Sequence, residues 1–248
     1  MKQFYFLLLT GISIVSAQVQ PTTSEKIEES LIAKQAMDAN SLVKNIPLKN
    51  VGPSVMSGRV VDLAVNDNNP TEYYVAYASG GLWYTNNNGN TFTPVMDETQ
   101  TQNLGDIAVH WQSGTIWVGT GENNSSRSSY AGIGILKSTD KGKTWQHMGL
   151  SDSHHIGRIV VNPDNANEVT VGVTGHLYSP NKERGIYKTT DGGKTWKKTL
   201  FIDDNTGIID VAVSPNNYQM QYAAAWQKDR KAWNFSGSGE GSGIYKST

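Results

Sequence analysis

The chain has 248 residues, 25 of them glycine, and a formal net charge of −1. Because the charge is balanced and no basic stretch stands out, no nucleic-acid partner is predicted. The sequence contains no cysteine, which excludes a disulfide framework, a cysteine-linked lipid anchor and a thiolate metal site.

The first 17 residues are typical of an export signal. A single lysine precedes the apolar run 4–15, and the small residues Ser16 and Ala17 stand before the expected cleavage point. The run is too short to cross a bilayer, although a retained signal anchor is the alternative reading. We expect a protein that is secreted or held in a bacterial-type cell envelope, with no membrane span after cleavage.

Residues 18–50 form a leader of a different kind from the rest of the chain. The segment 24–37 is charged, and Ile27, Leu31 and Ile32 share a stripe at helical spacing. We therefore predict one helix over 24–37. The leader is either mobile or a strut docked on the domain that follows.

One phrase recurs along the chain, beginning at Gly81, Gly134, Gly185 and Gly243. The second and third copies read GILKSTDKGKTW and GIYKTTDGGKTW, the first reads GLWYTNNNGNTF, and the last reads GIYKST, at the C-terminus of the sequence. A fixed period of about 50 residues indicates an array of structural repeats.

Each copy of the phrase predicts two short strands joined by a tight turn. The Asp side chain is expected to accept backbone hydrogen bonds within the turn, the Gly to supply a positive φ, and the aromatic residue to return into the apolar interior. An acid at the same turn of every repeat indicates a structural rather than a catalytic role. The residues assigned to these roles are Asn87, Gly89, Phe92, Asp140, Gly142, Trp145, Asp191, Gly193 and Trp196.

Two further strands are predicted before each hairpin. The first of them carries the apolar anchors Leu63, Ile107, Ile159 and Val211. Four antiparallel strands in about 50 residues make a propeller blade. We predict an all-β, incomplete β-propeller with blades at 58–97, 104–149, 156–201 and 207–248, the last truncated. Four blades would leave both ends open, so we expect further blades in the same, longer chain.

The phrase around Asp140 and Asp191 resembles the Asp-box of neuraminidase-type (BNR) repeats. The stretches GRVVDLAV (58–65), VGTGENN (118–124) and HIGRIVVNP (155–163) resemble the large secreted bacterial propellers with sortilin-type repeats, often labelled glycosyl hydrolase. The resemblance covers about residues 46–248. It implies a long multi-bladed propeller but no single activity, because propellers host many functions.

A weaker resemblance links the chain to xyloglucan-cleaving propellers. That group carries a catalytic Asp before a Gly-Gly pair in the first blade, in a T-D-x-G-G phrase, but the matching stretch 77–81 reads YASGG and has no carboxylate. A glycosidase normally uses two carboxylates. A second acid would lie in a repeat beyond residue 248.

The connections 121–132, 175–184 and 226–243 exceed ordinary hairpin lengths and are predicted on the face opposite the Asp-boxes. Long loops on a rigid scaffold usually carry function, and aromatic, amide and acidic side chains suit a glycan or peptide ligand. The alternative is that these loops are solvated and pack on one another. Glu122, at a strand end, is the best catalytic candidate. The candidate ligand-binding residues are Glu122, Asn123, Arg127, Tyr130, His154, His155, His176, Tyr178, Arg184 and Trp233.

Two polar groups have alternative readings. Asp152 with His154, His155 and His176 matches no zinc spacing, so neither a metal nor another cofactor is predicted. In each predicted blade one polar residue stands immediately before the apolar anchor of the first strand, and we call these residues the column. The column residues either bond to neighbouring blades, with the arginine compensating the charge of the acids, or form a polar ring for a ligand at the mouth of the central channel. The column residues are Asp62, Asp106, Arg158 and Asp210.

The sequence therefore predicts an exported propeller that binds an extracellular glycan or peptide on its long-loop face. The alternative is a glycoside hydrolase whose carboxylates lie partly beyond residue 248. A third class is a purely architectural module, which would bind no ligand.

Overall fold

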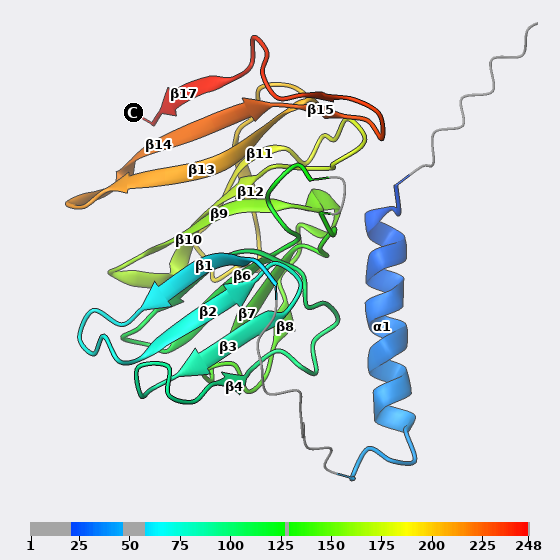
Figure 1. Cartoon of the computed structure of the whole chain (residues 1–248), viewed down its shortest axis with the longest axis vertical. Coiled ribbons are helices and arrows are strands. Elements are labelled where there is room, and N and C mark those ends of the chain that lie inside the picture. Colours follow the sequence, from blue (N-terminus) through cyan, green and yellow to red (C-terminus); the bar gives the residue numbers. More distant parts are fainter. Residues whose placement is uncertain (1–20, 47–57, 127–128, 248) are drawn as a thin grey trace, which may run out of the picture.

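The computed structural model describes residues 21–46, 58–126 and 129–247, in which helix α1 precedes a series of antiparallel sheets (Figure 1). The predicted signal segment 1–17 and the candidate ligand residue Arg127 lie outside the described residues. No helix in the described ranges combines the length and the apolar character that a membrane span requires.

Helix α1 spans Ser24–Asn40, three residues beyond the predicted end. It begins where the Thr23 side chain accepts a hydrogen bond from the Lys26 N–H. Ile27 and Leu31 are buried, as the stripe predicted, but Ile32 is 66% exposed. The buried stripe on α1 is therefore narrower than the sequence suggested.

The helix contacts the 3₁₀ helix η1 (Ser151–Ser153), which the sequence analysis did not predict. The Ser151 hydroxyl donates a hydrogen bond of 3.1 Å to the Glu28 carboxylate. Figure 1 shows α1 standing beside the sheets, along the side on which the long loops emerge. The helix thus has the position of a strut docked on the β domain.

In the described residues four sheets of three or four strands follow, and in each of them the strands pair antiparallel in their sequence order. The first sheet contains β1 (Val60–Val65), β2 (Tyr73–Tyr77), β3 (Gly81–Thr85) and β4 (Thr93–Pro94). The second contains β5 (Leu104–His110), β6 (Thr115–Thr120), β7 (Ile135–Ser138) and β8 (Gln146–His147). The third contains β9 (Ile156–Asn162), β10 (Asn165–Val173), β11 (Gly185–Thr189) and β12 (Lys197–Leu200). The fourth contains β13 (Thr206–Ser214), β14 (Asn217–Gln227) and β17 (Gly243–Lys246).

This architecture is an incomplete β-propeller, and it confirms the fold class predicted from the repeats. The first strands β1, β5, β9 and β13 lie next to one another in succession. A small hairpin of β15 (Asp229–Arg230) and β16 (Phe235–Ser236) was missed as well, and it stands where only a loop was expected. A loop of that length had room for a two-stranded ribbon of its own.

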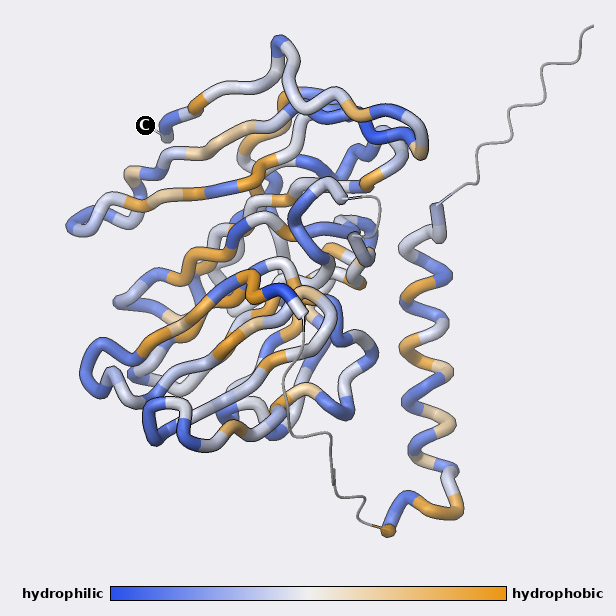
Figure 2. Tube along the Cα trace, in the orientation of Figure 1, coloured by the Kyte–Doolittle hydropathy of each residue, from blue (hydrophilic) through white to orange (hydrophobic). Residues whose placement is uncertain are grey.

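The apolar cores lie between neighbouring sheets rather than within one layer. Tyr74 and Leu82 of the first sheet pack with Ile116 of the second, and Trp117 of the second packs with Val171 of the third. Figure 2 shows the apolar residues along the strands and the hydrophilic residues at the turns. Face-to-face burial of this kind is the main stabilising contribution in stacked sheets.

The outer faces of the two end sheets expose apolar side chains. Leu63 is 54% exposed, whereas its counterparts Ile107, Ile159 and Val211 are buried against the preceding sheet. The expectation that Leu63 is a buried anchor was therefore wrong, because no described sheet precedes β1. At the other end, Ile244 is 73% exposed.

The turns between the third and fourth strands, at 86–91, 139–144 and 190–195, form the repeat hairpins. Asp140 accepts the Thr144 N–H at 2.9 Å and the Thr144 hydroxyl at 2.6 Å. Asp191 repeats these contacts with Thr195. In the first copy, Asn87 accepts the N–H of Thr91 at 3.0 Å. An amide and two carboxylates thus close equivalent turns, and the substitution in the first copy preserves the geometry.

The residue before each hairpin glycine is also left-handed. Gly142 has φ 86°, and Lys141 before it has φ 63°, a conformation that strains a side-chain-bearing residue.

The tryptophans have a role beyond their own turn. The Trp145 indole donates to the Val95 carbonyl and that of Trp196 to the Met148 carbonyl, at 2.7 and 2.6 Å. Each therefore fastens its hairpin to the preceding sheet.

Candidate functional site

The long loops converge on one pocket at the side of the sheets that faces α1. Its volume is about 610 Å³, and five segments contribute to its walls. The lining residues are Pro21, Thr22, Ser129, Ala131, His154, His155, His176, Leu177, Tyr178, Ser179 and Ala232. The convergence of these segments makes this side of the molecule the candidate ligand site.

Three polar side chains meet at the edge of this pocket. The Nε2 atom of His176 lies 3.0 Å from Oδ1 of Asp152, and Nε2 of His154 lies 3.8 Å from the same oxygen. The two imidazole rings are stacked, with centroids 3.8 Å apart. Both histidines were predicted from the sequence as candidate ligand-binding residues, but only the fold brings them next to Asp152.

Local backbone geometry produces this meeting. Asp152 lies in η1, and His154 follows it with a positive φ of 54°, which directs it differently from its neighbour His155. His176 follows Gly175, a glycine with φ 80° at which a Cβ would lie 2.4 Å from the Arg184 side chain. The Nδ1 atom of His176 lies 2.8 Å from the Ser179 hydroxyl, which fixes the ring orientation.

The histidines of this site are neutral at physiological pH. Burial lowers the pKa of His154 to about 4, and the nearby His176 lowers it further. Burial also lowers the pKa of His176, although Asp152 opposes the shift. Each ring therefore keeps one nitrogen lone pair available to a ligand or an ion.

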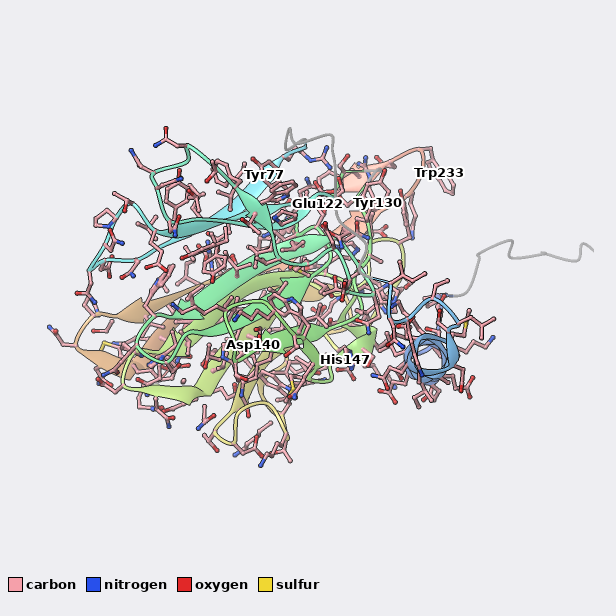
Figure 3. The ribbon with its side chains drawn as sticks, turned by 90° about the horizontal axis from the view of Figure 1, so that it is seen from below. Tyr77, Glu122, Tyr130, Asp140, His147 and Trp233 are labelled. Carbon is pink, nitrogen blue, oxygen red and sulfur yellow. The ribbon has the colours of Figure 1, made fainter. Side chains whose placement is uncertain are left out.

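His155 and Glu122, both predicted as ligand residues, are structural. The His155 Nδ1–H donates to the Glu122 carbonyl at 2.7 Å, and both side chains are buried. The Glu122 carboxylate is fully buried and accepts bonds from Arg59 and Asn124, each at 2.6 Å. Glu122 does lie on the loop side, as expected, next to Tyr130 (Figure 3), but its burial argues against a role as the catalytic acid.

Asn123 and Arg184 also bind the protein's own backbone. The Asn123 amide donates to the carbonyls of Gly105 and Gly157, which joins the second and third sheets. Arg184 is buried and donates to the carbonyls of Thr174, His176 and Ser179, so that it shapes the 175–184 loop from within. Burial lowers the pKa of Arg184 to about 10.

Aromatic side chains remain accessible around the pocket. Tyr178 lines it and is 43% exposed, while Tyr130 is half exposed on the loop that contributes Ser129 and Ala131. Trp233 is 85% exposed at the tip of the β15–β16 hairpin. Figure 3 shows Tyr130 and Trp233 toward the end of the sheets on which α1 lies, whereas Asp140 of the repeat hairpin lies nearer the middle of the view.

The column at the first strands is a set of bonds between sheets. Asp62 accepts the N–H of Ile107 at 3.2 Å, and Asp106 accepts that of Ile159 at 2.6 Å. Arg158 donates to Asp106 at 2.9 Å and to Asp210 at 2.7 Å. The column residues thus bond from one sheet to the next, while the Asp210 side chain stays 53% exposed.

A β-bulge immediately precedes each column residue. The residue before Asp62, Asp106, Arg158 and Asp210 is left out of the pairing with the second strand. A bulge re-aims the side chain that follows it. Burial raises the pKa of Asp106 well above its usual range, the nearby Asp62 carboxylate raises it further, and Arg158 opposes the shift.

Sequence reasoning missed several residues of this site. Lys228 is buried and donates to the His176 carbonyl at 2.9 Å, and burial beside Arg184 lowers its pKa to about 7. Asn181 is buried beside Asp152 and His176.

Comparison with solved structures finds GH74 enzymes whose fold is similar to that of this chain. An ancestral GH74 enzyme matches with a TM-score of 0.53 and 22% identity over 74% of this chain and 26% of the enzyme. The GH74 enzyme of Niastella koreensis matches with a TM-score of 0.51 and 26% identity over 75% of this chain and 28% of the enzyme. The GH74 xyloglucanase of Xanthomonas campestris gives a TM-score of 0.51 with 14% identity over 75% of this chain and 28% of the enzyme.

The chain thus spans little more than a quarter of the length of these enzymes. No protein-family model matches the chain, and no curated protein does. The likeness establishes a β-propeller fold. The activities of those enzymes are not carried over with it.

Proposed function

We propose that this chain provides the loop-side binding surface of a β-propeller that recognises an extracellular glycan. The observation that carries the proposal is the pocket lined by His154, His176 and Tyr178. Planar rings beside neutral hydrogen-bonding groups suit a sugar, which offers apolar faces and hydroxyl edges. Tyr130 and Trp233 extend the aromatic surface beyond the pocket.

The buried acids favour binding over hydrolysis. Glu122 is enclosed with Arg59, and Asp106 is held between sheets by Arg158 and the Ile159 N–H. A pair of carboxylates on either side of a glycosidic bond is therefore not formed by these residues.

The test is a binding screen of the purified chain against soluble polysaccharides, including xyloglucan and a pectin, by affinity electrophoresis. Tyr178→Ala and Trp233→Ala should weaken retention of the bound polysaccharide. Tyr222→Ala is the matched control, because Tyr222 is 40% exposed but lies on the open face of the last sheet. Retention that is unchanged in both loop-side variants, or binding only to a peptide library, would refute the proposal.

A glycoside hydrolase is the second candidate, favoured by the 26% identity to the Niastella koreensis enzyme. In the T-D-x-G-G phrase of the resembling xyloglucan-cleaving group the acid aligns with Ala78, which is buried and carries no carboxylate, so the first-blade acid has no counterpart there. Asp152 is the described pocket-edge carboxylate that is partly exposed. Release of reducing ends from xyloglucan that Asp152→Asn abolishes, with retained binding, would establish hydrolysis instead.

The proposal also includes export of the protein and additional blades around the binding surface. Export into the envelope or the medium rests on the apolar segment 4–15 and is checked by fractionation and N-terminal sequencing of the exported protein. The exposed apolar residues Leu63 and Ile244 support additional blades of the same longer chain, with Asp-box hairpins of the kind seen at Asp140. These additional blades would cover both end sheets.

A further inference from the structure

We propose that Asp152, His154 and His176 form a binding site for a divalent transition-metal ion, with Zn²⁺ as the reference ion. The three side chains come from two separate connections, and their ligand atoms all lie within 4.8 Å of one another. The proposal goes beyond glycan binding and does not depend on it.

The distances suit coordination after small side-chain movements. Zinc binds imidazole nitrogen and carboxylate oxygen at about 2.0–2.2 Å, which places neighbouring ligand atoms roughly 3–3.5 Å apart. His176 and Asp152 are already at 3.0 Å, and His154 and Asp152 are at 3.8 Å. Closing the set requires the His154 ring to move toward Asp152, away from its stacked arrangement on His176.

The groups around the three ligands are arranged as they are at metal sites. Ser179 engages Nδ1 of His176, which leaves Nε2 directed at Asp152, and a bond to the far nitrogen is the usual support of a metal-bound histidine. With the proton of the ring on Nδ1, the Nε2 lone pair faces the Asp152 carbonyl and carboxylate oxygens at 3.1 and 3.0 Å. These lone pairs repel one another when no proton lies between them, and a cation bound by both the imidazole nitrogen and the Asp152 oxygen would remove that repulsion.

Asn181 offers a fourth ligand. It is buried, and its Oδ1 has no hydrogen-bond partner, while its Nδ2 lies 3.1 Å from His176 Nε2 and 3.0 Å from Asp152 Oδ2. A half-turn of the amide exchanges the two atoms and brings the oxygen to that position. An amide oxygen there would complete a set of two nitrogens and two oxygens.

The donor set decides the class of ion. Two imidazoles with a carboxylate favour first-row divalent transition metals, whereas Ca²⁺ and Mg²⁺ prefer oxygen ligands. His154, His176 and Ser179 also line the pocket, so a bound ion would lie at the pocket wall.

The experiment uses the purified chain, stripped with a chelator and dialysed, and titrates ZnCl₂ by calorimetry, with MgCl₂ as a selectivity arm. We expect one Zn²⁺ per chain, and Asp152→Asn and His154→Gln should each weaken the affinity at least about tenfold. His110→Gln is the matched control. His110 has the same contact of Nδ1 with a serine three residues on, but its Nε2 contacts the Pro163 carbonyl at 3.0 Å. Its Zn²⁺ affinity should equal that of the wild type.

A second measurement is independent of how the variants fold. Co²⁺ added to the wild-type chain should give visible absorption bands of a nitrogen- and oxygen-ligated ion, and Zn²⁺ should displace it. The absence of saturable Zn²⁺ binding, unchanged affinity in the folded Asp152 and His154 variants, or equal loss in the His110 control would each overturn the site.

Discussion

Substitution of Asp106 tests whether the column at the first strands holds neighbouring sheets together. In Asp106→Ala the buried Ile159 N–H loses its acceptor at 2.6 Å, and Arg158 loses one of its two close carboxylates. An orphaned buried donor costs about 1–3 kcal/mol, and the partly exposed arginine, which keeps Asp210, adds little. We therefore expect Asp106→Ala to lower the free energy of unfolding by about 1–3 kcal/mol.

Asp106→Asn should cost less than the alanine change, because the amide oxygen still accepts the Ile159 N–H. The pKa of Asp106 also determines whether its contribution to stability rises or falls with pH. Since burial raises the folded pKa of Asp106 above its unfolded value, the folded protein holds this proton at pH values where the unfolded chain has lost it. The contribution of Asp106 to stability thus falls as the pH rises above about 4. The Asn variant lacks this loss, so its stability relative to the wild type should improve toward neutral pH.

The assay is urea unfolding of the three proteins, monitored by tryptophan fluorescence between pH 4 and pH 8. Equal destabilisation by alanine and asparagine, with the same pH dependence as the wild type, would refute the reasoning. A loss of glycan binding without any loss of stability would instead support the reading of the column as a ligand ring.

Other predictions concern the repeat hairpins, and each is checked by measuring folding stability in a denaturant or acid titration. Trp196→Phe should cost about 1–3 kcal/mol, because the Met148 carbonyl loses its indole donor; an unchanged midpoint would contradict this latch between sheets. Lys141→Gly should stabilise the chain by up to about 1 kcal/mol, since φ is 63° at this position, and a destabilised variant would show that the strain is absent. The hydrogen bonds from Thr144 lower the pKa of Asp140 to about 2. The contribution of the Asp140 carboxylate to folding stability should therefore be full above about pH 4 and vanish toward pH 2. Asp140→Asn should remove this part of the loss of stability in acid. An acid-unfolding profile identical to that of the wild type would contradict this prediction.

Most of the fold was accessible from the sequence because its signals are local. The repeated phrase around Asp140 and Asp191, with its glycine turn, fixes a hairpin within a dozen residues, and the period relates one blade to the next. What was missed depends on contacts between sheets. The exposure of Leu63 follows from the lack of a described sheet before β1.

The site was less predictable for the same reason. Glu122 follows a strand end, as expected, but it is buried and pairs with Arg59, which lies just before β1. His154 and His155 are adjacent in sequence, yet a left-handed backbone at His154 sends one to Asp152 and the other to the Glu122 carbonyl. No spacing rule expresses a change of direction that arises from a single φ angle.

Hydrogen–deuterium exchange with a bound oligosaccharide tests most directly which end of the sheets is the binding surface. The probe is a fragment of whichever polysaccharide is retained most strongly in the screen. The account predicts slower exchange in the loops 121–132, 175–184 and 226–243, and no change in the repeat hairpins at 86–91, 139–144 and 190–195. Protection confined to those hairpins, with the long loops unaffected, would contradict it.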